Sequence, residues 1–407
     1  SPLLAQQPDT AIPDLEAVIH PLTTASFPAD DTDLLPLDQL LDGKSLVAMG
    51  EASHAASEFF SMKARMFRYL VEHHGFRVFA LESTLGSTYA LNRYLVDGKG
   101  DARTALSRLD NAFWYSAEVL ALVDWMRDWN IQHPETKDQL LFLGFDVNSP
   151  AAAADCLRQY LQQVDTTFYN SHRADFSRQL LAGGAFFREL RDRMAQQRSA
   201  YVQASSLWAY QLAERGFVNI EQARLPHAFS YKVRDKSMAD NVRYLKDTFG
   251  PKLFLWAHNY HIAEKGWLGT QCMGGYLSAM YGESYYSIGF DFREGEIWAK
   301  KGANVLQVIL HGNKIRRCST HAPKNNSNYF TSYLGQTGHN LFFLDLDELT
   351  TQSAWWTKKL AAPLRMHFTD EWFARSKEYP KMQVRETYDA LIYVERVSPS
   401  GHFRYGR

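Results

Sequence analysis

Two short segments carry the residues best suited to chemistry in this chain. Residues 50–54 read Gly-Glu-Ala-Ser-His, and residues 256–261 read Trp-Ala-His-Asn-Tyr-His. Each segment follows an apolar run that predicts a buried strand, at residues 45–49 and 252–255. Because strand ends in an open α/β sheet converge on one crevice, we expect Glu51 and the imidazoles of both segments to meet there. Such groups transfer protons or bind metal ions, which indicates an enzyme.

His54 is the first candidate, since it lies three residues after Glu51 and just past the first strand. A neutral imidazole can take a proton from water near neutral pH, so we interpret His54 as a general base with Glu51 as its partner. The alternative is a helix-capping histidine. Glu82 ends the next apolar run, where a carboxylate is either a partner of a helix N-terminus or a catalytic group.

Four further residues could complete the site. His258 and His261 are three residues apart, which suits metal ligation on a helix; alternatively, one stabilises an oxyanion while the other packs. Arg234 could bind a carboxylate or an oxyanion, or could form a surface pair of little energetic value. Lys63 follows His54 by about two to three helical turns, and its alternative reading is a solvated helix residue.

Composition excludes several classes of protein. The 407 residues are 45% hydrophobic and 22% charged, with a net charge of -1, as in an ordinary soluble globular protein. This charge does not predict a nucleic-acid or membrane partner, and no apolar stretch approaches the roughly 20 residues of a membrane helix. The three cysteines form no disulfide framework or paired metal motif. We expect no cofactor, a small-molecule substrate, and an oligomeric state that the sequence leaves open.

The absence of familiar motifs narrows the mechanism. The chain contains no Gly-x-Ser-x-Gly, Walker, Gly-x-Gly-x-x-Gly or His-Glu-x-x-His sequence. What remains is water activation by acid/base groups, or a metal site of histidines and carboxylates.

Alternating strand-like and helix-like segments predict an α/β fold with a mainly parallel central sheet flanked by helices. Strands are expected at residues 45–49, 76–81, 140–145, 252–255, 285–290, 305–310, 341–346 and 390–394. Helices are expected at residues 34–41, 57–73, 117–130 and 237–249. Residues 151–235 lack strand signals and predict a large helical insertion.

Aromatic residues are abundant, with 25 Phe, 21 Tyr and 10 Trp. Half or more should be core, but several could line a cleft for a bulky, partly apolar ligand. The residues proposed to contact the substrate are Phe59, Trp114, Tyr115, Arg234 and Tyr260.

Several short blocks of this sequence, in the order in which they occur, resemble those of the erythromycin esterase family. The two histidine segments are the specific part, and the resemblance runs from about residue 34 to residue 396. Other matching blocks are Glu58-Phe59-Phe60, Lys63, Gly75-Phe76, Leu81-Glu82, Trp125 to Asn130, Gly144-Phe145-Asp146, Arg234-Asp235, Met238-Ala239, Asn241, Gly274, Gly282, Gly289-Phe290 and Tyr388-Asp389-Ala390-Leu391. Ser53 stands where the family usually has Thr, and residues 151–235 and 311–385 show little that matches.

The resemblance implies metal-independent hydrolysis of a macrolide lactone, a reaction of antibiotic resistance. His54 would be the general base, supported by Glu51 and Glu82. His258 or His261 would be the second imidazole, and Lys63 would lie near the carbonyl or its oxyanion. Two alternatives stay open. One is a metal-dependent hydrolase using Glu51, His54, Glu82 and His258, and the other is a non-catalytic binding protein of the same fold.

The expected organisation is an N-terminal extension at residues 1–33, one catalytic domain at residues 34–396 and a C-terminal tail at residues 397–407. We expect a cytoplasmic protein, or a periplasmic or secreted one if Ser1 follows a removed signal peptide.

Overall fold

A computed structural model describes residues 11–301, 315–368, 372–373 and 379–403. The chain forms two compact units, each assembled from separate segments. The first unit comprises Ser1–Phe76, Ser116–Leu122 and Phe254–Arg407, and the second comprises Arg77–Tyr115 and Val123–Leu253. None of the helices in the described part of the chain is both long and apolar enough to cross a membrane.

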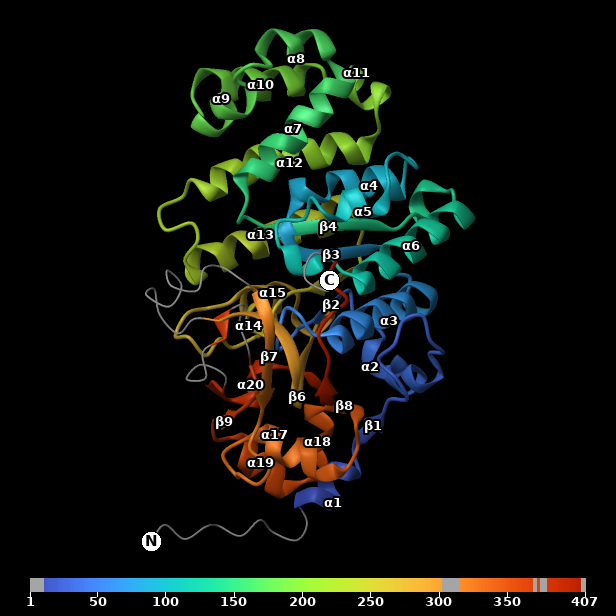
Figure 1. Ribbon diagram of the computed structural model, residues 1–407, viewed down its shortest axis with the longest axis vertical. Helices are drawn as coiled ribbons and strands as arrows, with labels where there is room; N and C mark the ends of the chain where they lie inside the picture. The colour runs from blue at the N-terminus through green and yellow to red at the C-terminus, as the bar shows by residue number, and fades with distance from the viewer. Residues whose placement is uncertain (1–10, 302–314, 369–371, 374–378, 404–407) are drawn as a thin grey trace. The chain divides into compact units, whose positions relative to one another are not determined.

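The first unit is built on a sheet with the strand order β1-β8-β12-β6-β2-β5 (Figure 1). Strands β2 and β12 run parallel to β6, whereas β8 runs antiparallel to β12 and β1 antiparallel to β8. Their bounds are β1 Ile19–Pro21, β2 Leu46–Met49, β5 Leu253–Trp256, β6 Tyr285–Lys301, β8 Leu341–Asp345 and β12 Ala390–Val397. The sheet therefore combines a parallel centre with an antiparallel edge.

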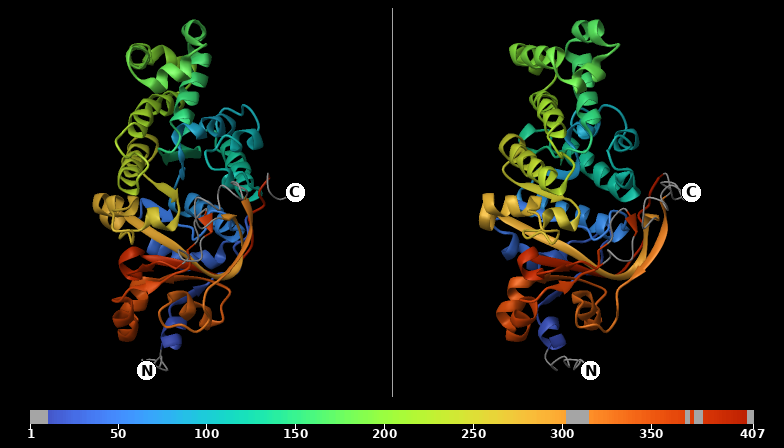
Figure 2. Two further views of the ribbon diagram at one scale, coloured as in Figure 1. Left: turned by 60° about the vertical axis from the view of Figure 1, so that its left-hand side comes forward. Right: turned by 90° about the vertical axis from the view of Figure 1, so that its left-hand side faces the viewer.

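Strand β6 is much longer than its neighbours and has two roles. Its first half pairs with β2 and β12 in the sheet. Its second half pairs antiparallel with β7 (Ile315–His321), and Figure 2 shows the two strands as a curved ribbon. Short β10 (Trp372–Phe373) also pairs with β6, while β9 (Leu364–Arg365) and β11 (Lys381–Met382) form a separate two-stranded sheet.

The first unit also contains twelve α- and 3₁₀-helices among its described residues. They are α1 Ala11–Glu16, η1 Thr32–Leu37, α2 Asp38–Leu41, α3 Ser57–His74, α14 Asn259–Ile262, α15 Met273–Tyr281, η5 Gly282–Ser284, α17 Phe330–Leu334, η6 Gly335–Thr337, α18 Leu346–Gln352, α19 Ala354–Leu360 and α20 Val384–Thr387. Helix α3 ends because Gly75 adopts a left-handed conformation with φ of 71°, which glycine reaches without steric cost.

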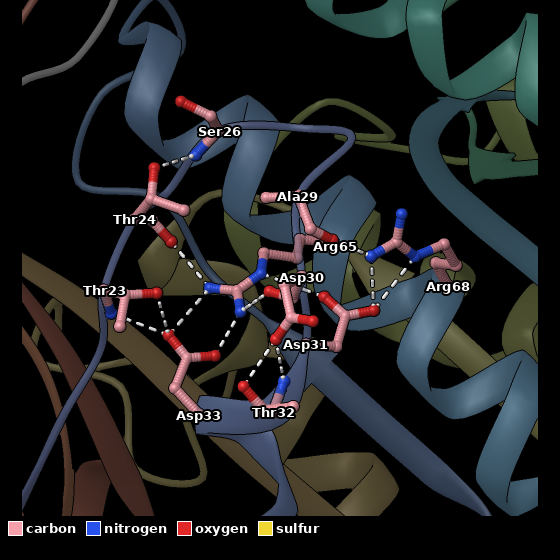
Figure 3. A network of polar contacts seen from close by, with 10 residues as sticks. All are labelled: Thr23, Thr24, Ser26, Ala29, Asp30, Asp31, Thr32, Asp33, Arg65 and Arg68. Carbon is pink, nitrogen blue, oxygen red and sulfur yellow. Dashed lines mark hydrogen bonds and ion pairs between the residues drawn. The ribbon is translucent and has the colours of Figure 1, made fainter.

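The N-terminal segment is joined to α3 by a buried arginine (Figure 3). The Arg65 side chain is fully shielded from solvent and donates to Asp31 at 2.9 Å and to the Thr24 carbonyl at 2.6 Å. It also pairs with Asp33, and Arg68 pairs with Asp31. Since a buried guanidinium is costly unless paired, these carboxylates fix the position of α3.

The second unit contains the parallel strands β3 (Val78–Thr84) and β4 (Leu141–Asp146). It also contains the helices that lie between β3 and β5 in the sequence, except for the start of α6. The helices are η2 Leu85–Thr88, α4 Tyr89–Leu95, α5 Ala102–Leu106, η3 Ala112–Trp114, α6 Ala117–Gln132, η4 Thr136–Asp138, α7 Pro150–Val164, α8 Thr166–His172, α9 Phe176–Ala182, α10 Ala185–Gln196, α11 Arg198–Ala204, α12 Leu207–Ala223 and α13 Tyr231–Phe249. Helix α6 begins in the first unit. Figure 1 shows α8–α11 grouped at one end of α7.

The predicted α/β fold with its helical insertion is confirmed, as residues 150–223 form six successive helices. Several predicted strands differ in their bounds from the observed strands, and the two differences that matter most concern β3 and β6. Strand β3 continues through Glu82 to Thr84, so Glu82 lies within a strand and not after one. Strand β6 extends eleven residues beyond Phe290. The strand predicted at residues 305–310 lies outside the described residues.

Candidate active site

Two strand ends meet in the first unit because Asn259 connects them. The Asn259 backbone N–H donates to the Glu51 carbonyl at 3.0 Å. Its side chain exchanges two hydrogen bonds with the Phe290 backbone, at 2.7 and 3.0 Å. A Cβ atom on Gly50 would lie 2.1 Å from Asn259 Oδ1, so only glycine permits this approach. The segments after β2 and β5 are thus brought side by side, as the sequence predicts.

Glu51 lies at the centre of the resulting cluster and is fully buried. Its Oε1 lies 2.6 Å from His54 Nδ1. Its Oε2 accepts hydrogen bonds from Lys63 Nζ at 2.7 Å and from Trp256 Nε1 at 2.6 Å. Both carboxylate oxygens are therefore engaged by side chains from the loop after β2, from α3 and from β5.

The surroundings of Glu51 favour its ionised form. Burial acts to raise the pKa of Glu51, but the charge of Lys63 and the hydrogen bond with His54 outweigh it, and the pKa lies below its usual value. A carboxylate next to Nδ1 favours the tautomer that has its proton on Nδ1 and a lone pair on Nε2. The pair therefore prepares His54 to accept a proton at Nε2.

Lys63 is enclosed, which differs from its expected place near a substrate carbonyl. Its side chain is 0% exposed, and its Nζ lies 4.3 Å from the centroid of the Trp256 ring and 5.3 Å from that of Phe290. The ammonium group thus faces Glu51 and aromatic rings. This position gives Lys63 the role of holding the Glu51 charge, and the reading as a solvated helix residue is wrong.

A second imidazole, that of His258, contacts the His54 ring. The two ring centroids are 4.7 Å apart with an interplanar angle of 61°. His258 comes just before the single turn α14, and its ring also contacts Phe368 with centroids 4.4 Å apart. His261 is also buried and contacts the Tyr260 ring at 5.5 Å. The ring contact therefore places the His258 imidazole beside that of His54.

Glu82 and Arg234 lie in the second unit, where they pair with each other. Arg234 Nη2 lies 2.7 Å from Glu82 Oε1, and the guanidinium also binds both oxygens of Asp146 at 2.8 and 2.9 Å. Burial acts to lower the pKa of Arg234, yet the charges of Asp146 and Glu82 outweigh it and raise the pKa. The Arg234 side chain is 13% exposed and is paired with two carboxylates, which corrects its reading as a surface pair.

A third carboxylate lies near this ion-paired cluster. Asp110 accepts the Thr84 backbone N–H at 2.5 Å. Burial raises the pKa of Asp110 to about 6, and the charge of Asp146 adds to the effect despite the hydrogen bonds from Thr84. The second unit therefore holds a titratable group that the sequence analysis did not single out.

Most of the aromatic residues expected at the site belong to the core. Phe59 is 0% exposed and packs on Phe290 at 4.7 Å, so it lies beneath the surface. Tyr260 is buried and hydrogen bonds with Thr270 Oγ1 at 2.8 Å. In the second unit Trp114 is buried and Tyr115 is half-buried.

Sequence reasoning did not assign roles to Trp256 and Asn259, although both belong to the segment it singled out. Their positions could have revealed these roles, because Trp256 is the last residue of β5 and Asn259 directly follows His258. Polar hydrogens at a buried strand end need acceptors, and here Glu51 and the Phe290 carbonyl supply them.

Metal ligation fits this arrangement poorly. The ammonium of Lys63 already lies against Glu51, where a metal ion would compete with it for the same oxygen. Within the described ranges, no three His, Cys, Asp or Glu side chains are grouped so that they could hold a metal ion.

Comparison with known proteins identifies a matching family. A family model described as erythromycin esterase matches residues 71–397. YbfO of Bacillus subtilis, a protein named as a hydrolase by inference, is 25% identical over 95% of this chain and 91% of its own length. Erythromycin esterase type II of Escherichia coli is 30% identical over 115 residues, which are 28% of this chain and 26% of that protein.

Solved structures share the architecture. A Bacillus cereus protein covers 97% of this chain and 99% of its own, with a TM-score of 0.79 and 22% identity. A succinoglycan biosynthesis protein covers 96% and 98%, with a TM-score of 0.75 and 23% identity. An erythromycin esterase mutant in its open conformation covers 91% and 95%, with a TM-score of 0.60 and 17% identity. At these identities the likeness shows the fold.

Proposed function

The chain belongs to the erythromycin esterase family, and from this premise we propose that it opens the lactone of a macrolide or a similarly bulky macrocycle with water activated by His54. Family membership and the names of the relatives indicate a hydrolase of the esterase type. The finer proposal rests on one observation, the hydrogen bond between Glu51 Oε1 and His54 Nδ1 at 2.6 Å.

This hydrogen bond supports a general-base role for His54. With the Nδ1 proton directed at Glu51, Nε2 is the ring nitrogen that takes a proton from the attacking water. The water oxygen adds to the ester carbonyl carbon, and the imidazolium that forms is stabilised by the adjacent carboxylate. A positioned general base contributes on the order of a hundred- to ten-thousand-fold in rate.

His258 is proposed as the acid that completes the cleavage. Its ring lies 4.7 Å from that of His54, so both imidazoles can reach one reacting carbon. When the carbon–oxygen bond of the tetrahedral intermediate breaks, the leaving oxygen takes a proton from His258, which enters the cycle as the imidazolium and ends neutral while His54 ends protonated. The products are one hydroxy acid from a lactone, or an acid and an alcohol from an open ester. Solvent returns the two imidazoles to their starting protonation states.

Glu51, Lys63 and Trp256 are proposed to hold the base in place without contacting the substrate. Lys63 keeps the buried carboxylate charged, and the Trp256 indole N–H fixes its orientation. This role for Lys63 replaces the expected contact with the oxyanion.

A His54→Asn variant tests the proposal directly. Asparagine keeps polar character but cannot act as a base near neutral pH, so we expect kcat on a macrocyclic lactone to fall by about a hundredfold or more. His227→Asn is the matched control, because His227 is an exposed histidine with φ of 57°, a conformation that asparagine tolerates. Mass spectrometry in isotopically labelled water should find one labelled oxygen in the product acid. Turnover of His54→Asn within a few-fold of the unmodified protein would remove His54 as the base.

A further inference from the structure

Three aromatic rings form a continuous wall that reaches His258. The Phe368 ring packs edge-on against His258, with centroids 4.4 Å apart and an interplanar angle of 67°. Trp267 contacts Phe368 at 5.6 Å, and Tyr260 contacts Trp267 at 5.0 Å. We call Tyr260, Trp267 and Phe368 the aromatic wall. It begins at one of the two imidazoles proposed to act on the substrate.

The wall is buried at one end and open at the other. Tyr260 is 2% exposed, whereas Trp267 and Phe368 are half-buried. Leu268, the residue after Trp267, is 50% exposed. Apolar area left in contact with water is unfavourable, so an apolar group that covers Phe368 and Trp267 gains free energy. The open end therefore has the properties of a binding surface.

The residue before Phe368 is fixed by a buried polar network. His367 is fully buried, its Nδ1 donates to the Phe292 carbonyl at 2.8 Å, and Thr320 Oγ1 donates to its Nε2 at 2.7 Å. Its ring also stacks on Phe292 with centroids 3.9 Å apart. Burial lowers the pKa of His367 to about 3, so the ring stays neutral and can accept the Thr320 hydrogen bond.

Asp291 fixes the backbone at the same point. Its Oδ1 accepts the His367 backbone N–H at 3.1 Å, and its Oδ2 accepts the Thr331 hydroxyl at 2.7 Å. Both groups are completely shielded from solvent. A ring whose backbone is held this firmly loses little conformational freedom when a ligand packs on it, which favours binding. Simple core packing of a half-buried ring would not require these two polar anchors.

We propose that Phe368 and Trp267 are specificity-determining residues, which hold the apolar part of the ester substrate beside the two imidazoles. The inference rests on the proposed esterase function and adds the surface that selects the substrate. An ester with a large apolar acyl or alcohol part covers both rings. A short acyl ester reaches neither, so its reaction gains nothing from them.

Paired substrates measure this selection. For Phe368→Ala and Trp267→Ala we expect kcat/KM on a macrocyclic lactone to fall about 10- to 100-fold more than kcat/KM on a small activated acetate ester. Phe368→Leu retains most of the apolar volume and should fall in between. Phe229→Ala is the control, because Phe229 is 58% exposed and lies in the second unit. In this variant the ratio of kcat/KM on the lactone to kcat/KM on the acetate ester should stay within about twofold of that of the unmodified protein. An unchanged ratio in both alanine variants overturns the proposal.

Binding separates this proposal from the proposed reaction. In a His54→Asn background, equilibrium binding of the intact lactone should weaken about tenfold when Phe368→Ala is added. If the unmodified protein hydrolyses neither ester, the proposed function fails, yet weaker lactone binding by the double variant still supports the wall. Equal affinity with and without Phe368, or no detectable lactone binding, overturns the wall.

Discussion

Lys63 Nζ lies 2.7 Å from Glu51 Oε2, and neither side chain is exposed to solvent. Two opposite charges at this depth depend on each other, because the cost of removing each from water is offset by the other. The hydrogen bond from His54 Nδ1 to Glu51 Oε1 places this ion pair directly behind the proposed base.

Lys63→Met should therefore impair catalysis without removing a group that contacts the substrate. Loss of the ammonium leaves Glu51 buried without its cation, which raises the carboxyl pKa and weakens its hold on His54. We expect kcat to fall at least about tenfold and the unfolding free energy to fall by about 3–5 kcal/mol. The acid limb of the pH profile of kcat/KM should move to higher pH. Lys236→Met, which removes an exposed surface ion pair, is the control and should change little.

Gly50→Ala should separate the two strand ends. The new Cβ would lie 2.1 Å from Asn259 Oδ1, so the amide must move and release the Phe290 backbone. We expect a loss of stability of about 1–3 kcal/mol and a loss of kcat of at least tenfold, because small displacements of catalytic groups are costly. Gly250→Ala is the control, since its Cβ would meet only Val78 Cγ2 at 3.5 Å. Equal behaviour of the two variants would argue against this close approach.

Arg234→Met should destabilise the second unit. It leaves the buried carboxylates of Glu82 and Asp146 without a cation, at an expected cost of about 3–5 kcal/mol in unfolding free energy. Arg243→Met removes a 57% exposed partner of Asp240 and should cost less than about 1 kcal/mol. Urea unfolding of both variants provides the comparison. A small loss for Arg234→Met would mean that the carboxylates find other partners or take up protons.

His367 and Asp291 should impose opposite pH dependences on stability. The folded pKa of His367, about 3, lies below its ordinary value of 6.5. Between these two pKa values the unfolded chain binds more protons than the folded chain does. The contribution of His367 to the unfolding free energy is therefore present above about pH 6.5 and is lost as the pH falls. The folded pKa of Asp291, about 7, lies above its ordinary value of 3.8 because of burial. Its contribution is therefore present below about pH 3.8 and is lost as the pH rises toward 7.

Measuring the unfolding free energies of His367→Asn and Asp291→Asn between about pH 4 and pH 7 checks these signs. In this range both groups bind different numbers of protons in the folded and unfolded states. The first variant should lose relative stability as the pH rises, and the second should gain it. Parallel pH curves for both variants and the unmodified protein would contradict the assigned protonation states.

Metal removal should leave activity unchanged. The proposed base is oriented by Glu51, and Lys63 supplies the nearby positive charge. Dialysis against a chelator should not lower turnover, and elemental analysis should find less than about one metal ion per chain. Activity that is lost on chelation and restored by Zn²⁺ or Mn²⁺ would favour the metal-dependent alternative.

The centre of the site could be predicted because its determinants are local. Glu51 and His54 are three residues apart in one loop, so their pairing needs no knowledge of distant segments. The length of α3 is equally local, since Gly75 at its end signals the left-handed cap. The meeting of His54 with His258 followed from a general rule about strand ends.

Other features depend on contacts that no short window of sequence contains. Phe368 reaches His258 because Asp291, about 75 positions earlier in the chain, binds the backbone next to it. Glu82 lies within β3 because that strand continues through a register shift near its end. The paired half of β6 carries several charged side chains, so its apolar signal stops at Phe290 although pairing with β7 continues.

The pairing of Arg65 with Asp31 and Asp33 determines where the chain can be shortened. Neither aspartate is placed to take part in the proposed reaction, yet α3 carries both Arg65 and Lys63. A truncated protein that starts at Leu34, where the apolar pattern suggests a boundary, would leave the Arg65 guanidinium buried and unneutralised. We expect such a protein to be poorly folded and inactive. The acidic stretch before the recognisable domain is therefore part of what must be expressed.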